Sequence, residues 1–140
     1  MLKIDGENLK VENVWEVAHR GLKVELAPVA REKVRRSRTY IENKIAQGEV
    51  IYGVNTGFGA FSSVRISQND IVQLQKNLIR SHSSGIGEPF SKEQTRAIML
   101  LRANALARGH SGVREVVIDK ILEFLNQDLI PVIPQQGSVG

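Results

Sequence analysis

Residues 92–108 read KEQTRAIMLLRANALAR, a segment whose apolar side chains fall on nearly every face of a helix. Ser91 and Gln94 form a capping box, which predicts that the helix begins at Lys92. Gly109 is placed to end it. Because a helix without a polar face is stable only when other elements cover it, we expect this segment to be buried among helices.

Further helices are predicted on both sides of this segment. Pro28 suits a first helical turn and Gly48 an end, while Ser67 with Asp70 marks another start. The expected helices cover residues 11–19, 28 to about 47, 67–82 and about 113–126. Extended pieces are expected at residues 2–4, 22–26, 50–54 and 130–134, and a break at residues 83–89. The fold class is therefore mainly α, with short β pieces.

Three amphipathic neighbours do not readily cover a helix that is apolar all round. In addition, residues 135–140 follow two prolines with no charge and no capping signal, unlike the end of a finished element. We therefore treat residues 1–140 as one unit and expect it to be an incomplete part of a larger protein.

Composition and charge narrow the classes of function. The chain has no cysteine, which excludes a disulfide framework and a Cys-based zinc site and favours the cytoplasm. A secretion signal and an apolar run of about 18 residues are both missing, so we expect neither export nor a membrane span.

The net charge of +4 comes from residues 31–38, which hold five basic residues and one acidic residue. This basic helix is typical of a solvated or subunit-contacting face, and nucleic-acid binding is the less favoured alternative.

The glycine-rich residues 52–59, YGVNTGFG, are a candidate site. They match neither standard phosphate-binding pattern, so a plain glycine-rich turn is the main alternative. Tyr52 beside these glycines is a possible acid-base group, although a phenol is almost fully protonated at neutral pH and needs nearby positive charge or donors. From composition alone, a core tyrosine is the more common outcome.

Histidine offers a second candidate. His82 continues the apolar stripe of its predicted helix, where a core histidine is more common than a general base, a metal ligand or a substrate contact. His19, His82 and His110 are far apart in the sequence and show no metal-ligand spacing, so no metal site is expected.

Four ordered blocks of sequence carry a resemblance to a known family. They are residues 52–59, residues 74–89 (LQKNLIRSHSSGIGEP), residues 101–104 with 109–114 (LRAN and GHSGVR), and residues 131–140 (PVIPQQGSVG). Together they resemble the aromatic amino acid ammonia-lyases, from about residue 30 to residue 140. The Ser81–His82 pair is similar to that of the histidine ammonia-lyases rather than the phenylalanine enzymes.

The resemblance implies a fold and a cofactor. The fold would be the N-terminal helical part of a fumarase/aspartase-like bundle, in a homotetramer whose active sites draw on three subunits. The cofactor would be 4-methylidene-imidazol-5-one (MIO), which forms when an Ala-Ser-Gly triplet cyclises and loses water. That triplet is expected directly after Gly140, so residues 1–140 would lack the cofactor and the later active-site residues. Alone, they would be inactive.

The resemblance also implies roles for single residues. Tyr52 would be the catalytic base on a loop that closes the site, Gly53 and Gly59 would let the backbone approach the substrate, and His82 would contact the substrate side chain. The implied reaction is histidine degradation, the conversion of L-histidine to trans-urocanate and ammonia. A tyrosine or phenylalanine ammonia-lyase or aminomutase is the nearest alternative. A stand-alone basic helical module that binds nucleic acid or a partner protein is the alternative from a different class.

Overall fold

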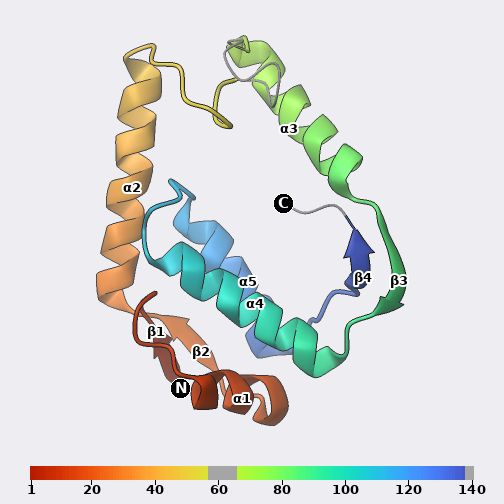
Figure 1. Cartoon of the computed structure of the whole chain (residues 1–140). Helices are drawn as coiled ribbons and strands as arrows, with labels where there is room; N and C mark the ends of the chain where they lie inside the picture. Colours follow the sequence, from red (N-terminus) through yellow and green to blue (C-terminus); the bar gives the residue numbers. More distant parts are fainter. Residues whose placement is uncertain (57–65, 138–140) are drawn as a thin grey trace. The chain divides into compact units, whose positions relative to one another are not determined.

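The computed structural model describes residues 1–56 and 66–137. It divides into two compact units (Figure 1). The first unit comprises Met1–Ile41 and Pro89–Ile133, and the second comprises Glu42–Glu88 and Pro134–Gly140. None of the helices in the described ranges is long and apolar enough to span a membrane.

The first unit combines helices with a small parallel sheet. Its elements are β1 (Leu2–Ile4), α1 (Val11–Arg20), β2 (Val24–Leu26), most of α2 (Pro28–Ala46), α4 (Lys92–Ala107) and α5 (Glu115–Gln127). β1 pairs in parallel with β2, with Leu2 opposite Val24 and Ile4 opposite Leu26. α4 packs against both α1 and α5. The predicted helices and the first two extended pieces are confirmed, each boundary lying within about two residues of the expected one.

α4 forms the centre of the first unit's core. Leu100, Ala103 and Ala107 are completely buried. The capping box is present, because the Ser91 hydroxyl accepts from the Gln94 N–H at 3.2 Å and the Gln94 amide oxygen accepts from the Ser91 N–H at 2.8 Å. Gly109 takes a positive φ of 75°, which few other residues adopt, and so ends the helix as expected.

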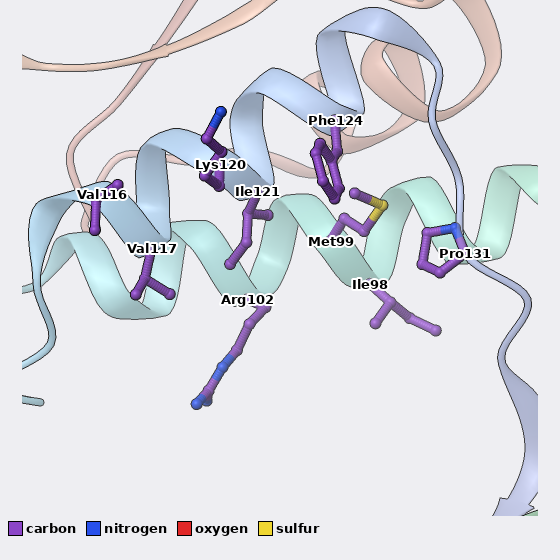
Figure 2. A pocket seen from close by; sticks show the side chains of 9 residues that line it. All are labelled: Ile98, Met99, Arg102, Val116, Val117, Lys120, Ile121, Phe124 and Pro131. Carbon is purple, nitrogen blue, oxygen red and sulfur yellow. The ribbon is translucent and has the colours of Figure 1, made fainter. Parts of the chain in front are cut away.

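Burial of α4 is not complete within the described residues. Ile98 and Leu101 remain 38% and 51% exposed. Ile98 and Met99 of α4 line an open apolar groove of about 530 Å³ with Ile121 and Phe124 of α5 (Figure 2). Within the described residues, α1 and α5 therefore cover only part of the helix, as expected if its neighbours in this chain do not suffice, and burial of the remaining faces stays a prediction.

Polar contacts hold the helices of this unit together. Arg96 of α4 is 5% exposed and donates to the carbonyls of Val17 and Leu125 at 2.9 and 3.1 Å. A buried guanidinium is tolerated when it is paired and hydrogen-bonded. Here Asp128 supplies the carboxylate, 2.9 Å from Nη1 of Arg96. The cation therefore joins α1, α4 and the end of α5.

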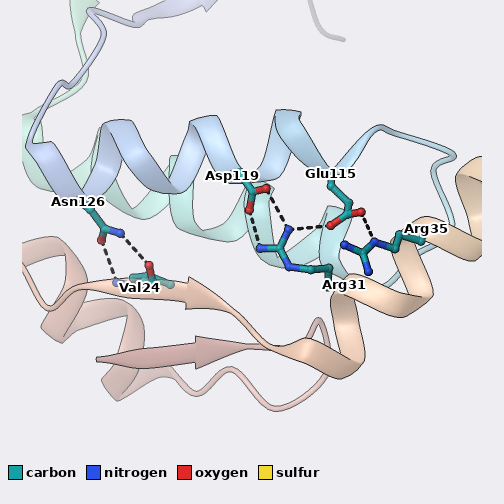
Figure 3. Close-up of polar contacts among 6 residues, drawn as sticks. All are labelled: Val24, Arg31, Arg35, Glu115, Asp119 and Asn126. Atoms are coloured by element: carbon teal, nitrogen blue, oxygen red, sulfur yellow. Dashed lines mark hydrogen bonds and ion pairs between the residues drawn. The ribbon is translucent and has the colours of Figure 1, made fainter.

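The basic run on α2 is largely paired with carboxylates (Figure 3). Arg31 donates to Glu115 at 2.7 Å and to both oxygens of Asp119 at 2.8 and 3.0 Å. Arg35 also binds Glu115, and Lys33 binds Glu7 at 2.7 Å. At least three of the five cations in residues 31–38 thus have acidic partners inside the first unit, which argues against a free phosphate-binding face.

The Glu115 carboxyl gives this cluster a pH dependence. Its pKa is held below the ordinary value of 4.5, first by the hydrogen bond from Arg31 and then by that from Arg35. A carboxyl with a lowered folded-state pKa stabilises the protein above its unfolded-state pKa, and this contribution is lost as pH falls through the folded value. Glu115→Gln should therefore lower the melting temperature of the complete protein at neutral pH, and the difference from wild type should shrink below about pH 4.5.

Melting curves of both proteins across pH 3–8 would test this expectation. Glu123→Gln is the matched control, because Glu123 also lies on α5 but makes only an exposed pair with Lys120. Such pairs contribute little. A Glu115→Gln difference that stays constant at every pH would show that the carboxylate charge is not the cause.

The second unit contains α3 (Gln68–His82), β3 (Gly85–Pro89) and β4 (Pro134–Gly137). Ser67 caps α3 by accepting from the Asp70 N–H at 3.3 Å, as predicted. The predicted break of the helix at residues 83–89 is confirmed, because α3 ends at His82 and α4 begins only at Lys92. Within the break, residues 85–89 form β3, a strand that was not predicted and that pairs with β4 in a separate two-stranded sheet (Figure 1). Residues 130–134 were expected to be extended, and the strand there begins only at Pro134.

The expected strand at residues 50–54 is wrong. Residues 52–55 form a turn, and Asn55 gives the physical reason. Its side-chain oxygen accepts from the Ile51 N–H at 2.7 Å, and its amide donates to the Glu49 carbonyl at 2.8 Å. The backbone groups that a neighbouring strand would have paired are therefore satisfied locally.

Candidate active site

The turn that carries Tyr52 is built around two buried polar side chains. Asn55 is 4% exposed and Thr56 1% exposed, whereas Tyr52 itself is 63% exposed. The Asn55 hydrogen bonds close the chain from residue 49 to residue 55, and the Asn55 carbonyl also accepts from the Ile66 N–H at 3.0 Å. The core-tyrosine alternative is therefore wrong for the described chain. The phenol lies on the outside of a turn whose polar interior is fixed.

Gly53 contributes to this turn through its backbone conformation. Its φ is 73°, in the left-handed region that favours glycine, and its N–H donates to the Thr56 hydroxyl at 3.2 Å. A side chain at this position would strain the turn directly beside Tyr52. The turn itself therefore explains why residue 53 is glycine. That the backbone of Gly53 approaches a substrate stays a prediction. Gly59 lies outside the described residues, so its expected role stays a prediction as well.

His82 is the last residue of α3 and is exposed, so the core-histidine alternative is wrong here. Its Nδ1 lies 3.0 Å from the Leu78 carbonyl oxygen and 2.9 Å from the Ser81 hydroxyl. Because a carbonyl oxygen only accepts, the Leu78 contact is a hydrogen bond when Nδ1 carries the proton. In the neutral ring, Nε2 is then an acceptor. The end of α3 therefore presents an oriented imidazole with one acceptor nitrogen.

The Ser81 side chain supports the same helix end. Its hydroxyl donates to the Leu78 carbonyl at 2.9 Å, and the Ser83 hydroxyl donates to the Ile79 carbonyl at 2.5 Å. The Ile79 carbonyl also accepts from the Ser83 N–H at 2.9 Å, so the side chains add further donors to carbonyls of the last turn. The Ser81–His82 pair is thus a local unit in which both side chains share one carbonyl.

The structure places Tyr52, Gly53 and His82 in the same compact unit. That unit also holds β4, which leads toward residue 140. Nothing in residues 1–56 and 66–137 forms a group of three or more His, Asp or Glu side chains suited to a metal ion. What the unit offers chemically is a phenol for proton transfer and an imidazole acceptor for recognition.

The apolar groove between α4 and α5 has different chemistry. Its charged side chains are Arg102 and Lys120, and the other lining residues are apolar. A groove of this kind can bury apolar surface but offers no carboxylate, imidazole or phenol for acid-base work. Tyr52 and His82 therefore remain the candidate site.

Two features of the site escaped sequence reasoning. Asn55 and Thr56 form the buried interior of the tyrosine turn, and asparagine's preference for bonding nearby backbone is the signal that could have indicated it. The β3–β4 pairing joins residues about 50 apart in the chain, and no local pattern announces it.

The sequence of the chain matches a known protein family. Residues 9–140 match the family described as aromatic amino acid lyase. The chain belongs to this family. It is 50% identical over 137 residues to histidine ammonia-lyase of Caldanaerobacter subterraneus subsp. tengcongensis, covering 98% of the chain and 27% of that relative. The chain thus spans little more than a quarter of the length of the curated relatives that it matches.

Solved structures of the family confirm the mainly helical fold. Tyrosine aminomutase from Streptomyces globisporus matches with a TM-score of 0.91 and 39% identity, over 98% of this chain and 26% of the other. Histidine ammonia-lyase from Trypanosoma cruzi matches with a TM-score of 0.88 and 34% identity, over 98% and 27%. Since a mutase and a lyase match almost equally well, the family fold does not by itself select the reaction.

Proposed function

We propose that the complete protein is a histidine ammonia-lyase that converts L-histidine to trans-urocanate and ammonia. The observation that carries this proposal is the 50% identity to a histidine ammonia-lyase over 98% of the chain. The homotetramer and the later active-site residues belong to the same proposal. A cytoplasmic location is supported by the absence of cysteine.

Removal of ammonia requires the loss of a proton from the carbon next to the amine-bearing carbon. That proton is barely acidic, so a base must be held against it. Tyr52 is suited to this task because its ring is exposed while Asn55 and Thr56 fix the turn beneath it. We assign the phenol oxygen of Tyr52 the role of receiving this proton. A turn with a fixed interior lowers the cost of orienting the base.

His82 is suited to recognise the substrate ring. With Nδ1 bonded to the Leu78 carbonyl, Nε2 can accept a hydrogen bond from the N–H of a substrate imidazole. Phenylalanine has no such donor and would leave Nε2 unpaired, which disfavours it. A tyrosine hydroxyl could also donate to Nε2, so the tyrosine lyase or aminomutase is the nearest alternative.

The cofactor MIO belongs to the same proposal, and the family supports it. The 140 residues contain no Ala-Ser-Gly triplet, but β4 pairs with the strand that begins three residues after His82. The chain leading toward the expected triplet therefore lies in the same unit as the imidazole. When present, the group supplies an electrophile that draws electron density from the substrate.

The basic helical module has less support. Arg31, Lys33 and Arg35 have carboxylate partners, so most of the charge that would attract phosphate is already neutralised. No observation on the described residues favours this class over the lyase.

Product analysis of the complete protein tests the proposal. L-histidine, L-tyrosine and L-phenylalanine would be supplied separately, with ammonia and the organic product measured for each. We expect equal amounts of ammonia and trans-urocanate from L-histidine and much slower turnover of the other two. A β-amino acid formed without ammonia would indicate an aminomutase, and faster release of ammonia from tyrosine would indicate a tyrosine lyase.

A further inference from the structure

The two peptide groups that flank Tyr52 are both held by hydrogen bonds. The Ile51 carbonyl, in the peptide before Tyr52, accepts from the Asn55 N–H at 3.2 Å. The Gly53 N–H, in the peptide after Tyr52, donates to the Thr56 hydroxyl at 3.2 Å. Because a peptide group is planar, holding both groups restricts the two backbone dihedral angles of Tyr52. The direction in which the phenol leaves the turn therefore depends on Asn55 and Thr56.

The Asn55 side chain adds a donor and an acceptor to the same turn. Its oxygen accepts from the Ile51 N–H at 2.7 Å, and its nitrogen donates to the Glu49 carbonyl at 2.8 Å. These partners fix which end of the amide is oxygen, since an N–H only donates and a carbonyl only accepts. Asn55 is 4% exposed, so water does not readily replace either partner. An ionised carboxylate would lack the donor, and an apolar side chain would lack both groups.

Asn126 makes the same pair of bonds in the first unit. Its side-chain oxygen accepts from the Val24 N–H at 2.8 Å, and its nitrogen donates to the Val24 carbonyl at 2.7 Å (Figure 3). These bonds hold β2 to the end of α5, and none of the residues assigned to the candidate site belongs to that unit. Asn126 therefore shows what this chemistry does when it only supports the fold.

We propose that Asn55 is a positioning residue for proton transfer, whose amide nitrogen, bonded to the Glu49 carbonyl, holds the turn so that the Tyr52 phenol meets the proton of the substrate. The inference rests on the proposed function. Asn55 acts in this role through the backbone of the turn. Its loss should therefore lower kcat more than it raises KM. A displacement of a reacting group by about 1 Å can cost about 10²-fold in rate.

The experiment compares Asn55→Ala and Asn55→Asp in the complete protein, with the amino acid that the wild type turns over fastest as substrate. Melting curves give the folded fraction, and kcat is expressed per folded protein. Both variants should lower kcat about tenfold or more near pH 8, with a smaller change in KM. Asn55→Ala removes both side-chain bonds without adding charge. Asn55→Asp keeps the acceptor for the Ile51 N–H and turns a second oxygen toward the Glu49 carbonyl.

Asn55→Asp should recover activity as pH falls. Burial and the facing carbonyl disfavour the ionised form, so the pKa of the new carboxyl lies above its ordinary value of about 3.9. Once protonated, the carboxyl donates to the Glu49 carbonyl as the amide did. The ratio of variant to wild-type kcat should therefore rise between about pH 8 and about pH 5, with no such rise for Asn55→Ala. The titratable side chains of residues 49–56 are Glu49, paired with Lys44 at 2.6 Å, and Tyr52, and both are unchanged in these variants.

Asn126→Asp is the matched control. It places a carboxylate oxygen against the Val24 carbonyl in the same way, so it should lower the melting temperature near pH 8. Its kcat should stay within a few-fold of wild type at every pH. A loss of kcat in Asn126→Asp equal to that in Asn55→Asp would show that general destabilisation is the cause and would overturn the inference.

The remaining outcomes separate the inference from the proposed function. Fastest turnover of an amino acid other than histidine would overturn the proposed substrate, while the Asn55 variants still test the inference on that amino acid. A complete protein that turns over none of histidine, tyrosine and phenylalanine would overturn both. A kcat of Asn55→Ala within a few-fold of wild type would overturn the inference alone. A loss in Asn55→Asp that does not recover at low pH would overturn the role of the donor.

Discussion

Replacing Tyr52 by phenylalanine should lower kcat for L-histidine by about 10²- to 10⁴-fold, the usual contribution of a positioned acid-base group. The substitution removes only the hydroxyl. Because the ring is 63% exposed and the buried interior of the turn comes from Asn55 and Thr56, we expect the fold to stay intact. Steady-state kinetics of the complete protein, together with its melting temperature, would measure both effects.

Tyr40→Phe is the matched control. Tyr40 is the other tyrosine of the chain, lies on α2 and is 61% exposed, close to the exposure of Tyr52. It should leave kcat within a few-fold of wild type. If Tyr52→Phe also retained activity within a few-fold, the phenol would not be the base. A raised KM with an unchanged kcat would point to binding alone.

Replacing His82 by leucine should reduce the preference for histidine over phenylalanine by about 10- to 100-fold in kcat/KM, the value of one hydrogen bond to a charged or strongly polar group. The variant loses the Nε2 acceptor and gains an apolar surface that a phenyl ring can contact. Competition between the two amino acids, followed by their separate products, would measure the change directly.

His110→Leu provides the comparison for this prediction. His110 is exposed and belongs to the first unit, whereas the residues assigned to the site belong to the second. The same chemical change there should leave the preference unaltered. An unchanged preference in His82→Leu would remove His82 from the role of side-chain contact.

Helix boundaries were predictable because they depend on neighbouring residues. The Ser91–Gln94 capping box and Gly109 are local signals, and the structure shows that both act at the ends of α4.

The strands were harder to predict. The prediction of a strand at residues 50–54 failed because the Asn55 side chain bonds backbone groups that a strand partner would have used. β3 was missed because its partner β4 lies about 50 residues away in the chain.

The candidate site was predictable only through the family resemblance. Residue type alone favoured a core tyrosine at position 52 and a core histidine at position 82, and the structure exposes both. Exposure follows from tertiary packing, which a helical stripe does not reveal. The orientation of the His82 ring needed the Leu78 and Ser81 contacts, which depend on atomic positions at the end of α3.

The central claim is that Tyr52 and His82 act on the same histidine molecule. A crystal structure of the complete Tyr52→Phe protein with bound L-histidine would test it most directly. We predict that Nε2 of His82 lies about 2.7–3.2 Å from a ring nitrogen of the substrate, with the residue 52 ring facing the carbon that loses its proton. A bound histidine whose ring contacts other residues, with position 52 turned away from that carbon, would contradict the account.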